Sequence, residues 1–422
     1  MIFESFIEAQ SYLLWSAFII AFIIGAIANK TNFCTMGAVS DMVNMGDYSR
    51  FRAWLLAIAV AMTGVVTLEF SGLISVDGAF PPYRDTQIIW LENLLGGFLF
   101  GVGMTFASGC GNKTLVRIGG GNIKSVMVLA VIGLVAFYMT NPFPGSDKTL
   151  YSVLFFDWVG PAAISLNSLS DIGSLISVES AVMIRLIVGL LIVSMLSIYI
   201  FKSAEFRSGF DNILGGLVIG LAVLAAWVIS SNIAINADEE LYSLGNYYQE
   251  WDMLADSDDG KPSRGRPLST QSFTFVNPMA QTYGYSMSGF NNIHLSFGIL
   301  SVLGVILGSF VWSLLSKGFR IEWFAGVKDF FMHFVGAAKH IKHTAFRAAQ
   351  KIENMIERRF AKSAHRNRIT FCRHFTDELT AGAKNLRHFL TGFHQLLHTF
   401  LQLRIGKSAK RSKKAPLRKR RQ

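Results

Sequence analysis

Six long apolar runs limit what this chain can fold into. Examples are YLLWSAFIIAFIIGAIA at residues 12–28, AVMIRLIVGLLIVSMLSIYIF at 181–201 and HLSFGILSVLGVILGSFVWSLL at 294–315. Runs of about 18 or more apolar residues are typical of helices that cross a bilayer. With 51% hydrophobic and 16% charged residues and a mean hydropathy of +0.39, the chain lacks the polar surface of several soluble domains. The sequence predicts a polytopic membrane protein.

Read in order, the apolar runs predict an all-α protein with about seven to eight transmembrane helices. The expected spans are approximately 10–29, 53–73, 88–107, 123–140, 181–201, 211–230 and 291–316, and an eighth begins near Val327. Two connecting segments, 141–180 and 231–289, contain LFFDWVGPAAI and FTFVNPMAQTYGY, which proline interrupts. These pieces are too short to span, so we expect short re-entrant half-helices. Similar glycine-rich stretches in the two halves favour pseudo-symmetric halves.

Charge separates the connecting loops into two sets. The first set is basic and contains Lys30, Arg50, Arg52, Lys113, Arg117, Lys124, Lys202, Arg207, Lys317 and Arg320. The second set contains Glu4, Glu8 and the acidic stretch NADEELYSLGNYYQEWDMLADSDDG. Basic loops face the cytoplasm in multi-pass proteins, so we expect a bacterial inner membrane protein with its N-terminus outside. No basic region precedes the first apolar run, so we do not expect a cleaved signal peptide.

Two cysteines each lie where an apolar run stops. Cys34 lies in NKTNFCTMGAVSDM, directly after the first expected span, and Cys110 lies in TFASGCGNKTLVRIGGGN, after the third. Gly109 and Gly111 flank Cys110, and a glycine lets the backbone approach a ligand closely and lets one helix end before another begins. Each motif therefore places a thiol at an interrupted helix.

The second cysteine motif also carries groups that attract anions. Lys113 and Arg117 follow Cys110 closely, and the glycine run that contains Gly120 and Gly121 precedes the next span. Free N–H groups at a helix start, together with the positive end of the helix dipole, bind anions. The candidate substrate-binding residues are therefore Cys34, Cys110, Gly109, Gly111, Lys113, Arg117, Gly120 and Gly121.

The chemistry of the two thiols narrows the class of ligand. Thiols suit soft ligands better than hard oxyanions, so they favour an anion that carries sulfur or selenium. Neither motif supplies a histidine or a second cysteine, and nearby cations repel a metal ion, so we expect no metal and no cofactor. Purely structural roles compete: membrane cysteines are often packing residues, Lys113 and Arg117 obey the positive-inside rule, and Asp41 suits a helix cap. Because both cysteines fall at the same topological level, we favour the functional interpretation.

The segments FCTMGAVSDM and GMTFASGCGNKTLVRIGGGNIKS resemble the two signature segments of the YeeE/YedE sulfur-transport family, which includes thiosulfate importers. NILGGLVIGLAVLAAWVIS and FTFVNPMAQT are similar to landmarks of the family's second half, so the resemblance covers residues 11–338. The resemblance implies transmembrane helices and half-helices in pseudo-symmetric halves. It also implies a central path in which cysteines relay thiosulfate through S–H···S contacts, without covalent sulfur transfer. Cys34 and Cys110 would be two relay thiols.

The chain departs from this family after HFVGAA. Residues 339–422 contain 22 Lys and Arg against 4 Asp and Glu, whereas residues 1–338 contain 17 against 24. The family pattern calls here for a span with a third cysteine, and Cys372 has no glycine break that fits that role. We therefore expect a membrane domain at 1–338, truncated in its second half, and a basic tail at 339–422 that is frameshifted or partly disordered. The alternative is an authentic tail that binds anionic lipid or RNA nonspecifically.

Together these features predict transmembrane uptake of thiosulfate or a related small sulfur-containing anion through a cysteine-lined pathway, and not an enzyme. The expected partners are this anion and the lipid bilayer, with no specific nucleic acid. One alternative is a membrane-embedded persulfide relay that serves a cytoplasmic sulfurtransferase-like protein and needs an accessible thiol. Others are a truncated transporter without activity and a packing or assembly protein in which both thiols are dispensable.

Overall fold

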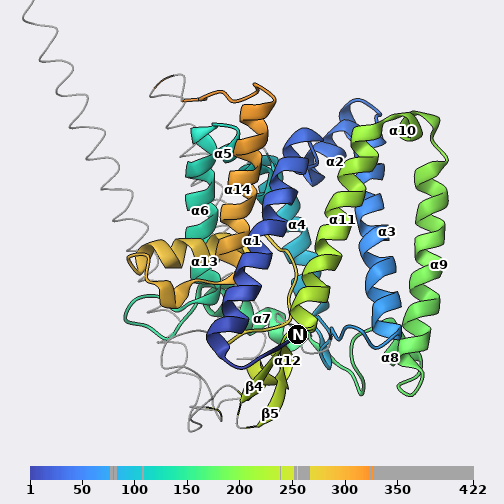
Figure 1. Ribbon diagram of the computed structural model, residues 1–422, viewed down its shortest axis with the longest axis vertical. Helices are drawn as coiled ribbons and strands as arrows, with labels where there is room; N and C mark the ends of the chain where they lie inside the picture. The colour runs from blue at the N-terminus through green and yellow to red at the C-terminus, as the bar shows by residue number, and fades with distance from the viewer. Residues whose placement is uncertain are drawn as a thin grey trace, which may run out of the picture. The chain divides into compact units, whose positions relative to one another are not determined.

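The computed structural model is a bundle of helices with a few short strands (Figure 1). It describes residues 1–76, 79, 83–106, 109–237, 239–250, 254, 267–323 and 326. Six described helices are long and apolar enough to cross a membrane: α1 (Phe6–Lys30), α3 (Ser49–Phe70), α6 (Ile123–Thr140), α9 (Ala181–Phe201), α11 (Phe210–Ser231) and α14 (Phe297–Leu315). These helices confirm the prediction of an all-α polytopic membrane protein.

One predicted span is slightly shorter than the others. The span expected at 88–107 is α4 (Trp90–Phe106), a helix of 17 residues, just below the length of about 18 that marks a spanning run. Its Leu94 and Phe98 side chains are 66% and 69% exposed, which suits a surface that faces lipid. The described residues therefore hold six candidate spans and α4, against the predicted seven to eight. The expected span near Val327 and the predicted tail at 339–422 lie outside the described residues.

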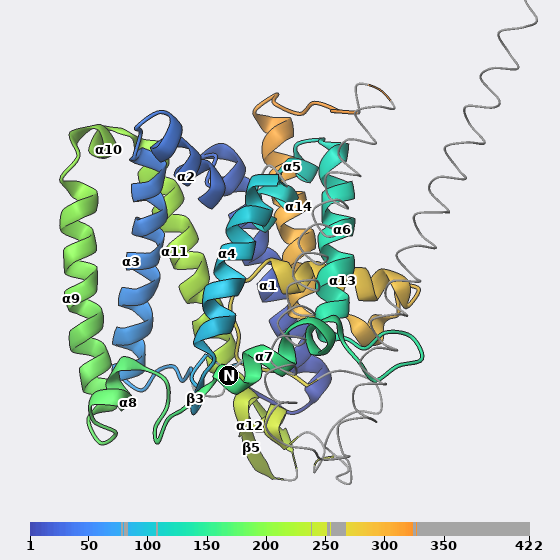
Figure 2. The ribbon, with the colours of Figure 1, turned by 180° about the vertical axis from the view of Figure 1, so that it is seen from behind.

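Short elements gather at the two opposite ends of the long helices (Figures 1 and 2). One end, which carries basic loops, holds α2 (Thr35–Asn44), α5 (Gly111–Gly119) and α10 (Ala204–Ser208). The other end holds η1 (Ser152–Phe156), α7 (Asp157–Val159), η2 (Gly160–Ala162), α8 (Ile172–Ile176) and α12 (Leu244–Gln249). Successive long helices therefore alternate in direction between the two ends.

The two segments predicted to contain half-helices do form short helices. LFFDWVGPAAI contains α7, η2 and the end of the π-helix η1. FTFVNPMAQTYGY contains most of α13 (Val276–Met287), which packs against α6 and α14 and is followed by η4 (Asn292–His294). A helix of 12 residues is about 18 Å long, too short to span a bilayer. Whether these helices re-enter the membrane stays a prediction.

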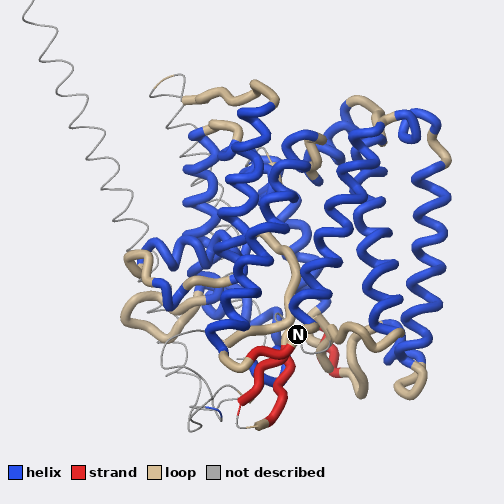
Figure 3. Tube along the Cα trace, in the orientation of Figure 1, coloured by secondary structure: helices blue, strands red, loops and turns tan. Residues whose placement is uncertain are grey.

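Short strands, which the sequence analysis did not predict, lie at the end opposite α2 (Figure 3). β1 (Ile2–Phe3) pairs in parallel with β4 (Ala234–Ala237), and β4 pairs antiparallel with β5 (Glu240–Ser243). β2 (Gln87–Ile88) pairs antiparallel with β3 (Ile164–Ser165). Alternate residues of β4 are buried, so one face of this small sheet packs against the rest of the protein. The first sheet fastens the N-terminal residues to the segment that follows α11.

The tightest packing lies at the crossing of α1 and α14, where glycines let two backbones approach. A Cβ on Gly308 would lie 1.9 Å from the carbonyl oxygen of Phe22, and one on Gly25 would lie 2.1 Å from the carbonyl oxygen of Val305. Small residues at such crossings increase the van der Waals contact that holds helices together in lipid. Buried side chains of α5, α11 and α13 complete this core.

We expect Gly308→Ala to destabilise the fold, because its new methyl group would force α1 and α14 apart. Overpacking of this kind costs about 1–3 kcal/mol. Thermal unfolding of the purified protein in detergent measures the effect. Gly96→Ala is the matched control, since a Cβ on Gly96 meets no described atom within 4 Å. Equal melting temperatures for the two variants would contradict a tight crossing.

An ion cluster joins α3 and α9 at the end opposite α2. Glu69 accepts hydrogen bonds from Arg84 Nη2 at 2.9 Å and from Arg185 Nη1 at 2.6 Å, and Asp171 accepts one from Arg185 Nε at 2.8 Å. All four side chains are at most 13% exposed. Two carboxylates balance two guanidinium groups, the kind of pairing without which buried charges are costly. The cluster therefore fixes the connection between α3, α8 and α9.

The pKa of Asp171 gives this cluster a testable pH dependence. Burial raises the pKa of Asp171, but hydrogen bonds from Ser174 and the charge of Arg185 outweigh burial and hold it below its ordinary value. A carboxyl group with a lowered folded pKa stabilises the fold above its unfolded pKa, near 4. That contribution is lost as the pH falls through the folded pKa.

We therefore expect Asp171→Asn to lower the free energy of unfolding by about 1–3 kcal/mol at pH 7. The difference from the wild-type protein should shrink below about pH 4, because Asp171 becomes protonated first in the unfolded chain and then, at lower pH, in the folded protein. Chemical denaturation of both proteins at pH 7 and at lower pH measures it. A difference that is the same at every pH would show that the charge of Asp171 contributes nothing.

Candidate functional site

Cys34 lies at the break between α1 and α2. After α1 ends at Lys30, Asn32 takes a left-handed backbone with φ of 52°, and Cys34 is extended at the N-cap of α2. The Sγ atom of Cys34 accepts a hydrogen bond from the backbone N–H of Gly37 at 3.4 Å. Serine, threonine, aspartate and asparagine usually supply this bond at a helix start. Here a sulfur atom takes their place.

Cys110 holds the corresponding position at the start of α5. It is the extended N-cap residue of that helix, with φ of −73° and ψ of 169°, and its carbonyl oxygen accepts a hydrogen bond from the N–H of Thr114 at 3.0 Å. Each thiol thus stands at the N-terminus of a short helix. Unpaired N–H groups and the helix dipole give such a position a positive partial charge.

The two motifs meet at their sulfur atoms. Although 76 residues separate the two cysteines, the Sγ atoms of Cys34 and Cys110 are 3.8 Å apart. The residues are 6% and 8% exposed, and both thiols are free. At this distance one S–H group can donate to the other sulfur atom. The structure therefore brings two soft, buried donors to one point.

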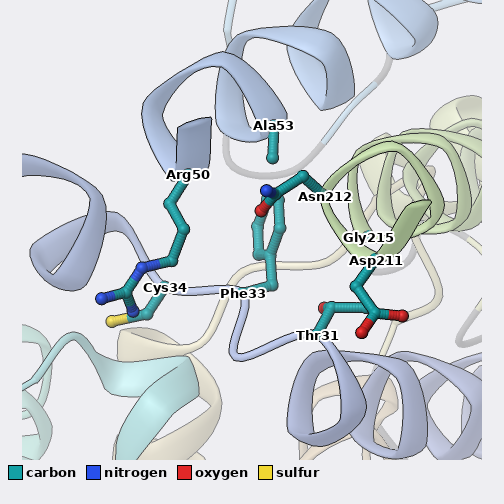
Figure 4. Close-up of a pocket in the computed structure, with 8 residues that line it drawn as sticks. All are labelled: Thr31, Phe33, Cys34, Arg50, Ala53, Asp211, Asn212 and Gly215. Atoms are coloured by element: carbon teal, nitrogen blue, oxygen red, sulfur yellow. The ribbon is translucent and has the colours of Figure 1, made fainter. Parts of the chain in front are cut away.

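Arg50 adds a cation beside the thiol pair. Its guanidinium group forms an ion pair with Asp41 of α2, whose side chain is 8% exposed. A Cβ on Gly37 would lie 2.8 Å from Arg50 Nη1 and 3.5 Å from the Cβ of Cys34. Gly37 therefore leaves space for the guanidinium group, which Figure 4 shows beside Cys34. The sequence analysis placed Arg50 in a basic loop and did not connect it with the site.

Lys113 links the second motif to the first. Its Nζ atom donates a hydrogen bond to Asn32 Oδ1 at 3.2 Å, across the break that follows α1. A Cβ on Gly109 would lie 3.2 Å from the Cβ of Lys113 and 4.0 Å from Arg117 Nη1. Gly109 therefore leaves room for both cations next to Cys110. Positive charge approaches the thiol pair from the side of α5 as well as from Arg50.

Gly111 brings α13 against the start of α5. A Cβ on Gly111 would lie 3.3 Å from Met279 Cε and 3.5 Å from the Cβ of Phe275. Met279 is 1% exposed, and its thioether is polarizable and apolar. Gly111, the residue after Cys110, therefore packs against an apolar, polarizable side chain, whereas Gly109 lies near cations.

Gly120 and Gly121 follow the C-terminal end of α5, away from Cys110. The sequence predicted an anion there, but backbone groups from another part of the chain lie against these glycines. The carbonyl oxygens of Gly120 and Gly121 accept hydrogen bonds from the N–H groups of Arg320 at 3.2 Å and Glu322 at 3.1 Å. A Cβ on Gly121, whose φ is 97°, would lie 2.4 Å from the carbonyl oxygen of Arg320. The described neighbours show these glycines in contact with the segment after α14, and a role in substrate binding stays a prediction.

A small cavity borders Cys34 between α1, α3 and α11 (Figure 4). Its volume is about 10 Å³, enough for about one water molecule. It is lined by Thr31, Phe33, Cys34, Arg50, Ala53, Asp211, Asn212 and Gly215. The cavity therefore lies between an exposed residue, Asp211, and the buried Cys34.

Asn112, two residues after Cys110, is a polar residue that the sequence analysis did not single out. Its Oδ1 atom is buried and accepts no hydrogen bond from the described residues. An unsatisfied buried polar group costs about 1–3 kcal/mol, so a ligand or water that paired with it would gain that contribution.

Among the described residues no group of three or more His, Cys, Asp and Glu side chains could hold a metal ion.

The family profile that matches this chain covers most of its length. A family described as sulphur transport matches residues 30–339, which include Cys34, Cys110 and their neighbouring cations. The chain belongs to this sulphur transport family. The family assignment made from the two cysteine motifs is thereby confirmed.

Two relatives of this chain are named thiosulfate transporters. TsuA of Escherichia coli strain K12 is 25% identical over 325 residues, which cover 74% of this chain and 77% of that protein. TsuA of Spirochaeta thermophila is 25% identical over 125 residues, which cover 30% of this chain and 36% of that protein. These relatives are transporters, so the prediction that the chain is not an enzyme is confirmed.

Burial of the thiols predicts how slowly they react with water-soluble reagents. We expect a membrane-impermeant maleimide, added from the side of α2 and α10, to label Cys34 and Cys110 at least about tenfold more slowly than an exposed thiol. A factor of ten corresponds to only about 1.4 kcal/mol of opening free energy. Mass spectrometry of labelled peptides over time measures both rates.

The matched control is Val43→Cys on α2, because Val43 is 72% exposed near the same end of the bundle. Cys372→Ser in every variant removes the third cysteine from the comparison. Labelling of Cys34 as fast as the control would place its sulfur in open water. That result would favour the alternative in which a soluble sulfurtransferase reaches the thiol.

Proposed function

We propose that this chain takes up thiosulfate or a related small sulfur-containing anion across the bacterial inner membrane, along a path that passes Cys34 and Cys110. The observation that carries the proposal is the 3.8 Å contact between the two Sγ atoms at the starts of two short helices. Membership of the sulphur transport family and relatives named thiosulfate transporters support it.

The charge around the thiols suits a sulfur oxyanion. Arg50, Lys113 and Arg117 lie close to the two cysteines or to the glycines beside them. The N-termini of α2 and α5 add positive partial charge. Asp41 neutralises part of the charge of Arg50, so the site attracts an anion without a large excess of cations. An anion held this moderately can also leave, which transport requires.

The two thiols suit the other half of the same ligand. Thiosulfate carries a terminal sulfur atom, which is soft and polarizable and accepts hydrogen bonds weakly. S–H groups are weak donors, and S–H···S contacts to Cys34 and Cys110 would form and break at low cost. The Met279 thioether near Gly111 extends this soft surface. A hard oxyanion without sulfur would gain the cations but not the thiols.

Movement at the helix breaks would open the path. The cavity beside Cys34 holds about one water molecule, so the described conformation is closed to thiosulfate. The chain is not continuous helix on either side of the thiols: residues 31–34 separate α1 from α2, and Cys110 precedes α5. Such interruptions let a short helix shift while the spanning helix stays in place.

The proposed orientation places the thiol end of the bundle in the cytoplasm. Lys30 lies over the rings of Phe210 and Trp312, at 5.8 and 5.5 Å from their centroids, at this end. Cations and aromatic side chains are enriched where helices leave the membrane, and basic loops face the cytoplasm. The N-terminus, at the start of α1, would then lie outside.

Uptake of labelled thiosulfate by cells that lack other importers tests the proposal. We expect Cys110→Ala to lower uptake at least about tenfold, because the alanine has no S–H group to contact the anion. A tenfold loss corresponds to a transport barrier that is higher by about 1.4 kcal/mol. Cys110→Ser keeps a hydrogen-bond donor, but its hydroxyl group is hard and does not suit a soft sulfur atom. It should therefore restore little of the thiosulfate uptake. Quantification of the protein in membranes separates lost transport from lost expression.

Cys372→Ser, which lies outside both cysteine motifs, is the matched control and should take up thiosulfate as the wild-type chain does. Normal uptake by Cys110→Ala would exclude the relay. Absence of uptake by the wild-type chain itself would support the alternative of a truncated transporter without activity. Competition by unlabelled sulfite, sulfate and selenium analogues then defines the substrate class.

A further inference from the structure

Two free thiols lie in direct contact, which is the arrangement from which a disulfide can form. The Sγ atoms of Cys34 and Cys110 are 3.8 Å apart, and a disulfide needs about 2.0 Å. Both residues are extended N-cap residues and not part of a helix interior. Rotation of the side chains, with small shifts at the two helix starts, can therefore bring the sulfur atoms together.

Cys34 is the thiol that a small oxidant meets first. It lines the cavity of about 10 Å³, and Cys110 is not among the lining residues. A cavity of this size holds about one water molecule, and hydrogen peroxide, which has one more oxygen atom, needs only a small widening of it. The N–H of Gly37 and the nearby guanidinium group of Arg50 stabilise negative charge on the Cys34 sulfur. The thiolate is the form of cysteine that reacts with peroxide.

We propose that Cys34 and Cys110 form a peroxide-sensitive dithiol site that closes to a disulfide. The Cys34 thiolate attacks one peroxide oxygen, the O–O bond breaks, and the departing hydroxide takes up the thiol proton to become water. The Cys110 thiol then attacks the sulfur of the resulting sulfenic acid. The S–O bond breaks, and hydroxide leaves with the proton of Cys110 as a second water. Two thiols are oxidised to one disulfide, and one peroxide is reduced to two waters.

The consequence for transport rests on the proposed function, whereas the disulfide itself does not. A disulfide removes both S–H donors from the proposed path. It also ties the start of α2 to the start of α5, which are the segments that would have to move. Oxidation would therefore stop uptake of the anion, and reduction would restore it.

The test uses the full chain with Cys372→Ser, so that Cys34 and Cys110 are its two cysteines, in membranes of cells that lack other thiosulfate importers. Membranes are reduced, freed of reductant and exposed to hydrogen peroxide, and remaining thiols are then alkylated. Mass spectrometry without reduction should show the Cys34 peptide joined to the Cys110 peptide, two hydrogen atoms lighter than the separate peptides. Uptake in vesicles should fall in proportion to the joined fraction and return with dithiothreitol.

Cys110→Ala in the same background is the matched control, and its Cys34 should accumulate sulfenic acid and higher oxides without any joined peptide. Separate, alkylated or over-oxidised cysteines in the two-cysteine protein would overturn the proposal. Joined peptides with unchanged uptake would confirm the disulfide but refute its effect on transport. If the reduced protein takes up no thiosulfate, the proposed function fails, and the peptide measurement still decides the disulfide.

Discussion

The contact between the two thiols depends on α14, which packs against α1, the helix that precedes Cys34, and against α5, the helix that follows Cys110. Gly25 on α1 and Gly308 on α14 let those helices cross at backbone distance, and Gly119 of α5 packs on the same helix, where a Cβ would lie 2.4 Å from the carbonyl oxygen of Ile306. α14 therefore fixes the end of α1, after which Cys34 follows, and the body of α5, which Cys110 begins. Cys34 and Cys110, which are far apart in sequence, meet because α1 and α5 both pack against the glycine-containing helix α14.

Polar groups inside this apolar crossing set its register. Asn29, the residue before the last residue of α1, donates to the Oγ atoms of Ser309 at 2.9 Å and Ser313 at 2.7 Å. Ser309 in turn donates from Oγ to the carbonyl oxygen of Val116 in α5 at 2.7 Å. In a region with little water, a slip of one helix would leave these groups unpaired, which is costly. The glycines permit the close approach, and the hydrogen bonds select one alignment. The position of the sulfur atoms follows from both.

This dependence explains which parts of the structure could be predicted from sequence. A bilayer requires a minimum apolar length, so α1 and α11 were predictable, whereas strands of two to four residues, such as β1 and β4, carry too little periodicity. Breaks marked by glycine or polar residues revealed Cys34 and Cys110, but their contact depends on the α14 crossing. Arg50 was not predictable as a site residue, because a loop cation looks the same whether it faces water or a thiol. The glycine run that contains Gly121 was predicted to bind an anion, which stays a prediction, and its contact with the backbone of Arg320 depends on the segment after α14.

In the proposed function, the same arrangement would set both the selectivity of the site and its sensitivity to oxidation. Positive helix ends and cations bind any small anion, so discrimination in favour of sulfur would have to come from soft groups, the thiols of Cys34 and Cys110 and the thioether of Met279. Softness also means easy oxidation, and the positive charge that attracts an anion stabilises the reactive thiolate. Burial to 6% and 8% exposure protects the thiols from large reagents while leaving a water-sized cavity beside one of them. A site built this way works best where thiols are kept reduced, and the basic end of the bundle would meet that environment if, as proposed, it faces the cytoplasm.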